Sequence, residues 1–277
     1  MSAGTLYVVA TPLGHLGDLS ERAASVLRGV NLVAAEDTRR ARVLLERAQA
    51  KPRVLSYHAH SPPSRAESLI DSLLGGESVA LLADAGTPTV SDPGVELVRR
   101  AHEVGVPVAT VPGPSAVTAA LSISGLPADR YTFLGFLPRK GRDRRALVQH
   151  VATAPWTTVL FEAPGRLVRL LHDLAQACGP ERRAAVAREL TKVHEELKSG
   201  TLSDLEVYYE ESPPRGEVTV LIAGTPSPAA PAPDEQTVRD RARELLGEGM
   251  TRRDAAGRLA AELALSRREA YRIVTNL

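Results

Sequence analysis

The sequence predicts an α/β protein with two α/β domains followed by a small helical domain. Short apolar runs alternate with helical patterns along most of the chain, which is typical of βαβ units with mainly parallel sheets. Nine such runs are many for one sheet at this spacing, so we expect two sheets. A stretch rich in Ala, Pro and Ser then separates these units from a final helical segment, which predicts an extended linker.

The expected elements and boundaries follow from these patterns. Strands are expected near 5–10, 31–35, 53–57, 78–83, 106–111, 132–136, 157–162, 183–188 and 217–223. Helices are expected near 20–28, 38–49, 64–75, 93–104, 114–124, 142–153, 165–177 and 203–210. The predicted domains are 1–114 and 115–224, with a linker over 225–233 and a helical domain over 234–277.

The final segment has the pattern of three helices. Ser266 and Glu269 form a capping box that opens the third helix. The second and third helices, joined through Leu263-Ala264-Leu265-Ser266, look like a helix-turn-helix. Arginine outnumbers acid there, and we expect Arg267 and Arg268 to contact RNA. The alternative is a small packing or dimerisation appendage with a solvated charged face.

Composition excludes several classes of protein. A single cysteine, Cys178, excludes an intramolecular disulfide and a Cys-cluster zinc site. Aromatic residues are only 4% of the chain, so base stacking on an aromatic platform is not expected. The net charge of +1 means that any contact with nucleic acid must come from local patches. No apolar stretch reaches the length of a membrane span and no leader pattern opens the chain, so a soluble, cytoplasmic protein is expected.

The segment 82–94 is the one that folding alone explains least. It follows a buried strand and is made of Gly, Pro, Thr, Ser and Asp, at the strand end where open α/β sheets place ligands. Gly86 allows close approach of a ligand, and two acids, Asp84 and Asp92, are more than a connection needs. The alternative is a turn in which Asp92 and Pro93 start the next helix.

Two further strands end in loops of the same kind. Pro112-Gly113-Pro114-Ser115-Ala116 follows the strand near 106–111, and Thr11-Pro12-Leu13-Gly14-His15 follows the first strand. Helices that begin with Gly and Pro leave backbone N–H groups free to point outward. Three such loops suit a ligand that the backbone itself touches.

These loops, in this order, resemble the tetrapyrrole-methylase superfamily of class III, S-adenosylmethionine-dependent methyltransferases. Further motifs resemble one branch of it, the small-subunit ribosomal RNA methyltransferases. They are Ala35-Glu36-Asp37-Thr38-Arg39, Ser56-Tyr57-His58, Asp84-Ala85-Gly86-Thr87-Pro88, Ser91-Asp92-Pro93-Gly94, Gly113-Pro114-Ser115-Ala116, Gly135-Phe136-Leu137-Pro138 and Arg188-Glu189-Leu190-Thr191-Lys192. The resemblance covers roughly residues 5–224 and implies 2′-O-methylation of a cytidine in the decoding region of 16S rRNA, free or in the small ribosomal subunit, by a homodimer.

The resemblance also implies where S-adenosylmethionine binds, in a cleft between the two α/β domains. The implied contacts are Pro12, Gly14, Ala85, Gly86, Thr87, Val90, Ser115, Ala116, Glu162 and Leu190. Two departures limit this transfer. His15 stands where the branch usually has Asn, and Ala163-Pro164-Gly165 stands where it often has Ser-Pro-His, so roles of those Asn, Ser and His residues do not carry over.

Methyl transfer to a ribose hydroxyl needs an aligned acceptor and a group that removes the hydroxyl proton. Charged residues at strand ends are the candidates, and we expect a catalytic role for Glu36, Asp37, Arg39, Glu189 and Lys192. For Asp37 the alternative is a helix cap, because acids favour helix N-termini. For the 188–192 group the alternative is a surface ion-pair cluster.

Contacts to RNA are expected mainly from the basic run after the strand near 132–136. Arginine-rich loops position RNA backbones without reading sequence. The candidates are His58, Arg139, Lys140, Arg142, Arg144, Arg145 and Arg188. The alternative for the basic run is a solvated helix start. No metal is expected, because His58 and His60 lack supporting ligands.

Three other functions remain open at this stage. A tetrapyrrole methyltransferase of the same superfamily would bind the same cofactor, but it leaves the basic run and the Arg-rich tail without a role. A nucleotide-binding oxidoreductase is disfavoured because Gly14 and Gly17 do not make the G-x-G-x-x-G pattern. A non-catalytic RNA-binding module would bind RNA but no S-adenosylmethionine.

Overall fold

In the computed structural model, which describes residues 2–225, 235–263 and 265–277, the first half of the chain forms a parallel five-stranded sheet. Its order is β3-β2-β4-β1-β5, with β1 (Leu6–Val9), β2 (Leu32–Ala35), β3 (Arg53–Ser56), β4 (Val79–Leu82) and β5 (Val108–Val111). Every residue of β2 and β4 is buried, so these two strands read as continuous apolar runs.

Helices cover both faces of this sheet. On one face α1 (Glu21–Gly29) and α2 (Thr38–Ala48) bury Leu27, Leu44 and Leu45 against the strands. On the other face α3 (Pro63–Leu74) and α4 (Val95–Glu103) bury Leu69, Leu73 and Leu97. All five strands run parallel, so their carboxyl ends, and the loops that follow them, share one edge of the sheet.

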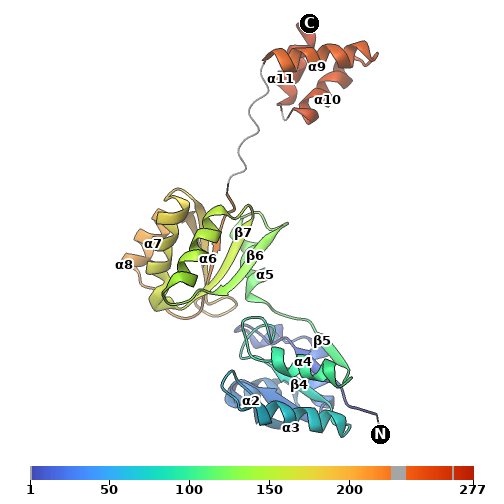
Figure 1. The fold of residues 1–277 in the computed structure, drawn as a ribbon, viewed down its shortest axis with the longest axis vertical. Coiled ribbons are helices and arrows are strands. Elements are labelled where there is room, and N and C mark those ends of the chain that lie inside the picture. Colours follow the sequence, from blue (N-terminus) through green and yellow to red (C-terminus); the bar gives the residue numbers. More distant parts are fainter. Residues whose placement is uncertain (1, 226–234, 264) are drawn as a thin grey trace. The chain divides into compact units, whose positions relative to one another are not determined.

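The second sheet is mixed, with the order β6-β7-β10-β8-β9. Its strands are β6 (Tyr131–Phe136), β7 (Thr157–Glu162), β8 (Arg183–Arg188), β9 (Glu196–Thr201) and β10 (Val218–Ile222). On one face α6 (Arg142–Thr153), α7 (Leu167–Cys178) and α8 (Leu202–Glu211) form an apolar core with it, as Figure 1 shows for α6 and α7. On the other face α5 (Ala116–Ser124) contacts β8, β9 and β10.

The nine expected strands and eight expected helices are all present near their predicted positions, but two details of the second sheet differ from expectation. It is not mainly parallel, because β10 runs antiparallel to both β7 and β8. It also contains β9, which the sequence analysis missed. That strand is a sheet edge with only Gly200 buried, and its polar residues, among them Lys198 and Ser199, have no apolar alternation to reveal it.

The contacts divide the chain into two compact units, Met1–Thr225 and Pro226–Leu277. The second unit contains α9 (Glu235–Gly247), α10 (Arg252–Glu262) and α11 (Arg267–Thr275) around a core that includes Val238, Leu245 and Leu259. The expected linker over 225–233 lies, apart from Thr225, outside the described residues. Across the described ranges, none of the helices is long and apolar enough to cross a membrane.

Candidate functional site

The loops that follow β1, β4 and β5 are bound to one another at the carboxyl edge of the first sheet. Thr11 and Gly86 exchange two backbone hydrogen bonds, of 2.8 and 3.0 Å, which join the first loop to the β4 loop. The hydroxyl of Thr87 donates to the carbonyl of Pro114, at 3.3 Å, which joins the β4 loop to the β5 loop. The three loops that the sequence singled out therefore form one surface.

The backbone of these loops is unusual. Thr89 and Ser91 have φ values of 73° and 62°, in the left-handed region that residues other than glycine rarely adopt. Glu189 and Thr191, after β8, have φ values of 50° and 64°. Non-glycine residues in this region cost free energy and cluster at binding and catalytic sites, so these four positions mark the loops as functional candidates.

The loops of the two sheets contact each other directly. The backbone N–H of His15 donates to the hydroxyl of Thr191, at 3.1 Å. Gly14 lies so close to Lys192 that an added Cβ would meet that side chain at 2.2 Å. Leu13 is buried in a core with Val117 of α5 and Leu190. The loop after β1 thus holds the loop after β8 in place.

A cavity of about 450 Å³ lies between these loops, within the usual size range of small-ligand sites. We call it the central cavity. Its walls come from both sheets and include Leu13, Glu36, Arg40, Asp84, Ala85, Val90, Ser91, Asp92, Ala116, Phe136, Phe161, Glu162, Ala163, Pro164 and Glu217. A second cavity, of about 300 Å³, shares Leu13, Arg40 and Asp84 with it and is also lined by Pro12, Gly14, Asp37 and Lys192.

The central cavity is acidic. Five carboxyl groups line it, those of Glu36, Asp84, Asp92, Glu162 and Glu217, against the single guanidinium of Arg40. Burial raises the pKa of Asp92 to about 7, helped by repulsion from Glu36, Asp84 and Glu217. Burial, with repulsion from Asp84, also raises the pKa of Glu36. Such a cavity favours a ligand that carries positive charge.

Asp92 differs from the other acids in its surroundings. Its carboxyl group is half-buried and, in the part of the chain that the structure describes, has neither a hydrogen bond nor an ion pair. Asp84, by contrast, accepts a hydrogen bond from the backbone N–H of Asp37 at 2.9 Å. An unpaired carboxyl group with a pKa near neutrality, lining a cavity, is a candidate acid–base group.

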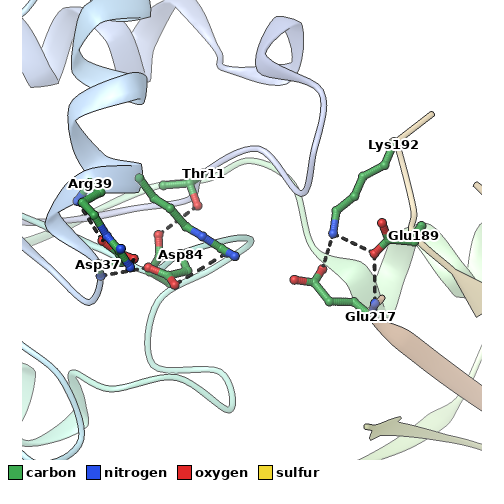
Figure 2. A network of polar contacts seen from close by, with 9 residues as sticks. Thr11, Asp37, Arg39, Asp84, Glu189, Lys192 and Glu217 are labelled. Carbon is green, nitrogen blue, oxygen red and sulfur yellow. Dashed lines mark hydrogen bonds and ion pairs between the residues drawn. The ribbon is translucent and has the colours of Figure 1, made fainter. Parts of the chain in front are cut away.

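Glu189 and Lys192, which follow β8, form a polar network with Glu217, drawn in Figure 2. Lys192 Nζ donates to Glu189 Oε1 at 2.9 Å and lies 3.1 Å from Glu217 Oε2. Burial acts to raise the pKa of Glu189, but hydrogen bonds from Lys192 and from the backbone N–H of Glu217 outweigh it and lower that pKa. Burial likewise acts to lower the pKa of Lys192, and its bonds to Glu189 and Glu217 reverse this and raise it. Both side chains therefore stay charged and paired.

Asp37 and Arg39 have local partners instead. The Asp37 carboxylate caps α2 by accepting from the backbone N–H of Arg39 at 2.8 Å, and the Arg39 guanidinium pairs with the same carboxylate (Figure 2). These hydrogen bonds from Arg39 hold the pKa of Asp37 well below its usual range. This placement favours the helix-cap interpretation of Asp37 over a catalytic one.

Glu162 is the most buried of the cavity acids. Its side chain forms an ion pair with Arg166 and its Oε1 accepts from the backbone N–H of Ala163, at 2.8 Å. Its Oε2 is buried without any hydrogen-bond partner in the structure. A buried acceptor without a partner is costly unless a ligand supplies the donor.

The expected cofactor residues fall into two groups. Ala85, Val90, Ala116 and Glu162 line the central cavity. Others support the loops that surround it: Pro12, Gly14, Gly86, Thr87, Ser115 and Leu190. Ser115 is the N-cap of α5 and Leu190 is buried in the core beneath that helix.

The expected RNA contacts also divide. Arg139, Lys140, Arg142 and Arg145 are exposed around the start of α6, and Arg267 and Arg268 are exposed on α11. Arg144 requires a correction, because it is 5% exposed and its guanidinium is bound by Asp173 and by the carbonyl of Pro138. Arg188 is likewise occupied, by Glu196 at 2.7 Å. Neither guanidinium is free for a phosphate in this structure.

Several cavity residues were missing from the sequence-based site. Asp84 and Asp92 were noticed in their loop but received no catalytic or binding role. Phe136 belongs to the Gly135-Phe136-Leu137-Pro138 motif but received no role. Phe161 and Glu217 had no signal, because they come from two other strand ends of the second sheet. In the part of the chain covered by the structure, His, Cys, Asp and Glu side chains form no group that could hold a metal ion.

Comparison with known proteins assigns the family. The family model of the Tetrapyrrole (Corrin/Porphyrin) Methylases matches residues 5–206. The chain is 44% identical over 274 residues to the Ribosomal RNA small subunit methyltransferase I of Synechocystis sp., covering 99% of this chain and 98% of that protein. It is 48% identical over 230 residues to the protein of the same name from Pseudomonas aeruginosa, covering 82% of each.

Solved structures agree with the fold. A uroporphyrin-III C-methyltransferase from Thermus thermophilus superposes with a TM-score of 0.58 at 25% identity, over 80% of this chain and 94% of that one. A uroporphyrin-III C-methyltransferase from Thermus thermophilus solved with S-adenyl homocysteine gives a TM-score of 0.58 at 22% identity, over 79% of this chain and 97% of that one. The chain therefore belongs to the tetrapyrrole methylases and, within them, to the family of the ribosomal RNA small subunit methyltransferases I.

Proposed function

We propose that this protein transfers the methyl group of S-adenosylmethionine to the ribose 2′-hydroxyl of a cytidine in the decoding region of 16S rRNA. The observation that carries the proposal is the identity of 44% over almost the whole of a ribosomal RNA small subunit methyltransferase I. The identity to the uroporphyrin methyltransferase, 25%, is much lower, which favours RNA over a tetrapyrrole as substrate. A homodimer is proposed on the resemblance alone.

The central cavity fits the proposed methyl donor in size and in charge. The donor supplies an electrophilic methyl group on a positively charged sulfonium. Five carboxyl groups around one guanidinium favour such a cation, and Glu162 Oε2 is a buried acceptor without a donor among the described residues. Ala85, Val90 and Ala116 would leave room for the ligand, because their side chains are small and apolar. Gly86 would let the loop backbone pass close by, with its φ of 79°.

Asp92 is proposed as the group that takes the proton of the acceptor hydroxyl. A general base works best with a pKa near the operating pH, and the pKa of Asp92 is raised to about 7. Glu36 would act through Asp92, since the charge of Glu36 is one of the causes of the raised pKa of Asp92. Glu189 and Glu217 would hold the Lys192 ammonium in place beside the site.

The reaction is tested by incubating the purified protein with S-adenosylmethionine and either naked 16S rRNA or small subunits from cells that lack this gene. Ribose methylation is mapped by partial alkaline hydrolysis. The expected product is one 2′-O-methylated cytidine in the decoding region. Methylation of uroporphyrinogen in a parallel assay, with no change in rRNA, would contradict the proposal.

The proposed base is tested by single-turnover rates over a range of pH. Asp92 is active when ionised, so the wild-type rate should rise with pH through about 7 and level off above it. Asp92→Asn should lower the plateau by about 10²-fold or more and remove this dependence. Glu36→Gln should move the midpoint to lower pH, because it removes a repelling charge.

The matched control is Asp71→Asn, an exposed acid on α3 that lines none of the described cavities. Glu189→Gln should weaken the hold on Lys192 and slow transfer without moving the midpoint. If Asp92→Asn and Glu36→Gln both keep the wild-type dependence of rate on pH, neither residue takes part in the proton transfer.

A further inference from the structure

A third cavity, of about 460 Å³, lies beside the central cavity and has received no role so far. We call it the β3–β4 cavity, because its walls are the segments that follow those two strands. Residues 57–67 form one wall and residues 92–100 the other. Asp92 lines both this cavity and the central one, so the two cavities share a wall at that carboxyl group.

We propose that the β3–β4 cavity receives the acceptor nucleotide, with its ribose directed toward the central cavity at Asp92. The inference rests on the proposed function, since it places the acceptor of that reaction. The acceptor oxygen must lie in line with the donated methyl group, so its pocket must adjoin the donor's pocket. The β3–β4 cavity is of ligand size and shares a lining carboxyl group with the central cavity.

The walls of the cavity suit a nucleotide. Tyr57, Pro62, Pro63 and Pro93 give rigid apolar surfaces on which the flat face of a base can lie. A cavity of this kind accepts a base splayed out of a single strand and not one stacked in a duplex. The decoding-region target of the proposed reaction is therefore expected to enter unpaired.

The polar groups of the cavity match the remaining parts of a nucleotide. His58 Nδ1 accepts the backbone N–H of His60 at 3.2 Å, which leaves Nε2 to donate. Arg100 adds a guanidinium whose one ion pair among the described residues is with Glu103, and α4 begins at this cavity without a side-chain cap. These are donors for the sugar–phosphate backbone.

Glu67 supplies the means of base selection. It lines the cavity, is exposed, and has no hydrogen bond or ion pair to any described residue. A carboxylate can accept from the exocyclic amine of cytosine, whereas uracil presents a carbonyl at that position. The neighbouring Glu96 is already paired with Arg99, and Asp92 is assigned to the ribose, which leaves Glu67 as the acceptor for the base.

The pocket is tested by filling it. Ala59 is exposed and lines the cavity, so Ala59→Trp adds bulk there without disturbing the core. We expect at least a tenfold loss of affinity for an oligonucleotide of the decoding region, with unchanged calorimetric affinity for S-adenosylhomocysteine. The control is Ala128→Trp, at an exposed position between α5 and β6 that lines none of the described cavities.

Base selection is tested by titrating cytidine and uridine monophosphates into the complex with S-adenosylhomocysteine and following amide shifts. Wild-type protein should bind the cytidine nucleotide more tightly. Glu67→Ala should remove the preference, whereas Glu46→Ala, an exposed acid on α2 without side-chain partners in the described structure, should keep it. These measurements do not depend on turnover.

The outcomes separate this inference from the function on which it rests. If wild-type protein methylates no 16S rRNA, the proposed function fails. If wild-type protein methylates it and Ala59→Trp binds the oligonucleotide as Ala128→Trp does, the function stands and the pocket assignment is wrong. If Ala59→Trp does not fold, His58→Ala replaces it. A tenfold loss of oligonucleotide affinity in His58→Ala supports the pocket, and unchanged affinity overturns it.

Discussion

At the scale of single residues, Gly86 holds the loops of the site together. It has a φ of 79° and pairs with Thr11 through two backbone hydrogen bonds. A side chain there is strained by the backbone, and it would enter the space between Leu13 and the carbonyl of Pro114. Gly86 thus joins the β4 loop to the first loop, and its neighbour Thr87 joins the β4 loop to the β5 loop.

Gly86→Val should therefore abolish binding of S-adenosylhomocysteine in calorimetry while the protein stays folded. Gly105→Val is the matched control, because Gly105 also has a positive φ, 73°, but lies in the turn before β5 with nothing close to its Cβ position. That variant should lose some stability and keep its affinity. Unchanged affinity in Gly86→Val would mean that the cofactor site lies elsewhere.

His15 departs from the pattern of the branch that the sequence resembles, but it still caps the short helix that follows. The short 3-10 helix η1 (Leu16–Asp18) has His15 as its N-cap, and Nδ1 of the ring accepts from the backbone N–H of Gly17 at 3.2 Å. Asparagine, usual at this position in the branch that the sequence resembles, also offers a side-chain acceptor for such a turn. The imidazole thus takes the place of an amide.

His15→Asn should leave the free energy of unfolding within about 0.5 kcal/mol of wild type, whereas His15→Ala should lower it by about 0.5–1 kcal/mol, as for loss of an exposed cap. Urea denaturation measures both. Equal stability of the two variants would show that the ring contributes no cap.

At the scale of elements, an ion pair joins α6 to α7. Its basic member, Arg144, was expected from the sequence to contact RNA. Arg144 lies in the first turn of α6 and reaches Asp173 of α7, at 2.7 Å, with its own side chain 7% exposed. Arg145, next along the helix, is exposed. Helical periodicity separates the two, because adjacent residues on a helix point in directions about 100° apart.

Arg144→Ala should lower the free energy of unfolding by about 1–3 kcal/mol, because it removes charged hydrogen bonds and leaves Asp173 without its partner. Arg145→Ala should change stability by less than about 0.5 kcal/mol and instead weaken RNA binding. Denaturation and filter binding on the same two proteins measure both effects. If Arg144→Ala is as stable as Arg145→Ala, the buried pair contributes nothing to the fold.

At the scale of the whole molecule, the chain has a separate unit with exposed arginines, which we propose as phosphate contacts. The unit Pro226–Leu277 has its own apolar core. Arg267 and Arg268 on α11 are exposed and have no ion-pair partner among the described residues. Arg243, in the same unit, is paired with Asp240 at 2.7 Å.

Deleting residues 226–277 should weaken RNA binding and flatten its salt dependence, and leave S-adenosylhomocysteine affinity unchanged. Each phosphate contact contributes about −0.7 to −0.9 to the slope of log K against log salt, so the double variant Arg267→Ala, Arg268→Ala should reduce the slope by up to about 2. Arg243→Ala should change it less. A salt slope that survives the deletion would assign the segment a role other than RNA binding.

The sequence by itself determined the strands, the helices and the family, because these depend on local apolar periodicity and on motifs that are contiguous in the chain. It also located the loops of the site, since Gly and Pro at strand ends have few structural uses. The positions of Ala85, Val90, Ala116 and Glu162 around one cavity agree with this reading.

Only the tertiary structure decided which of the charged residues face that cavity. Asp37 and Arg144 looked available in sequence, but a helix cap and a buried ion pair occupy them. Asp92 looked like a helix start, and its raised pKa comes from burial and from carboxylates distant in sequence. Partners of this kind depend on packing between strand ends, and local sequence patterns carry no record of them.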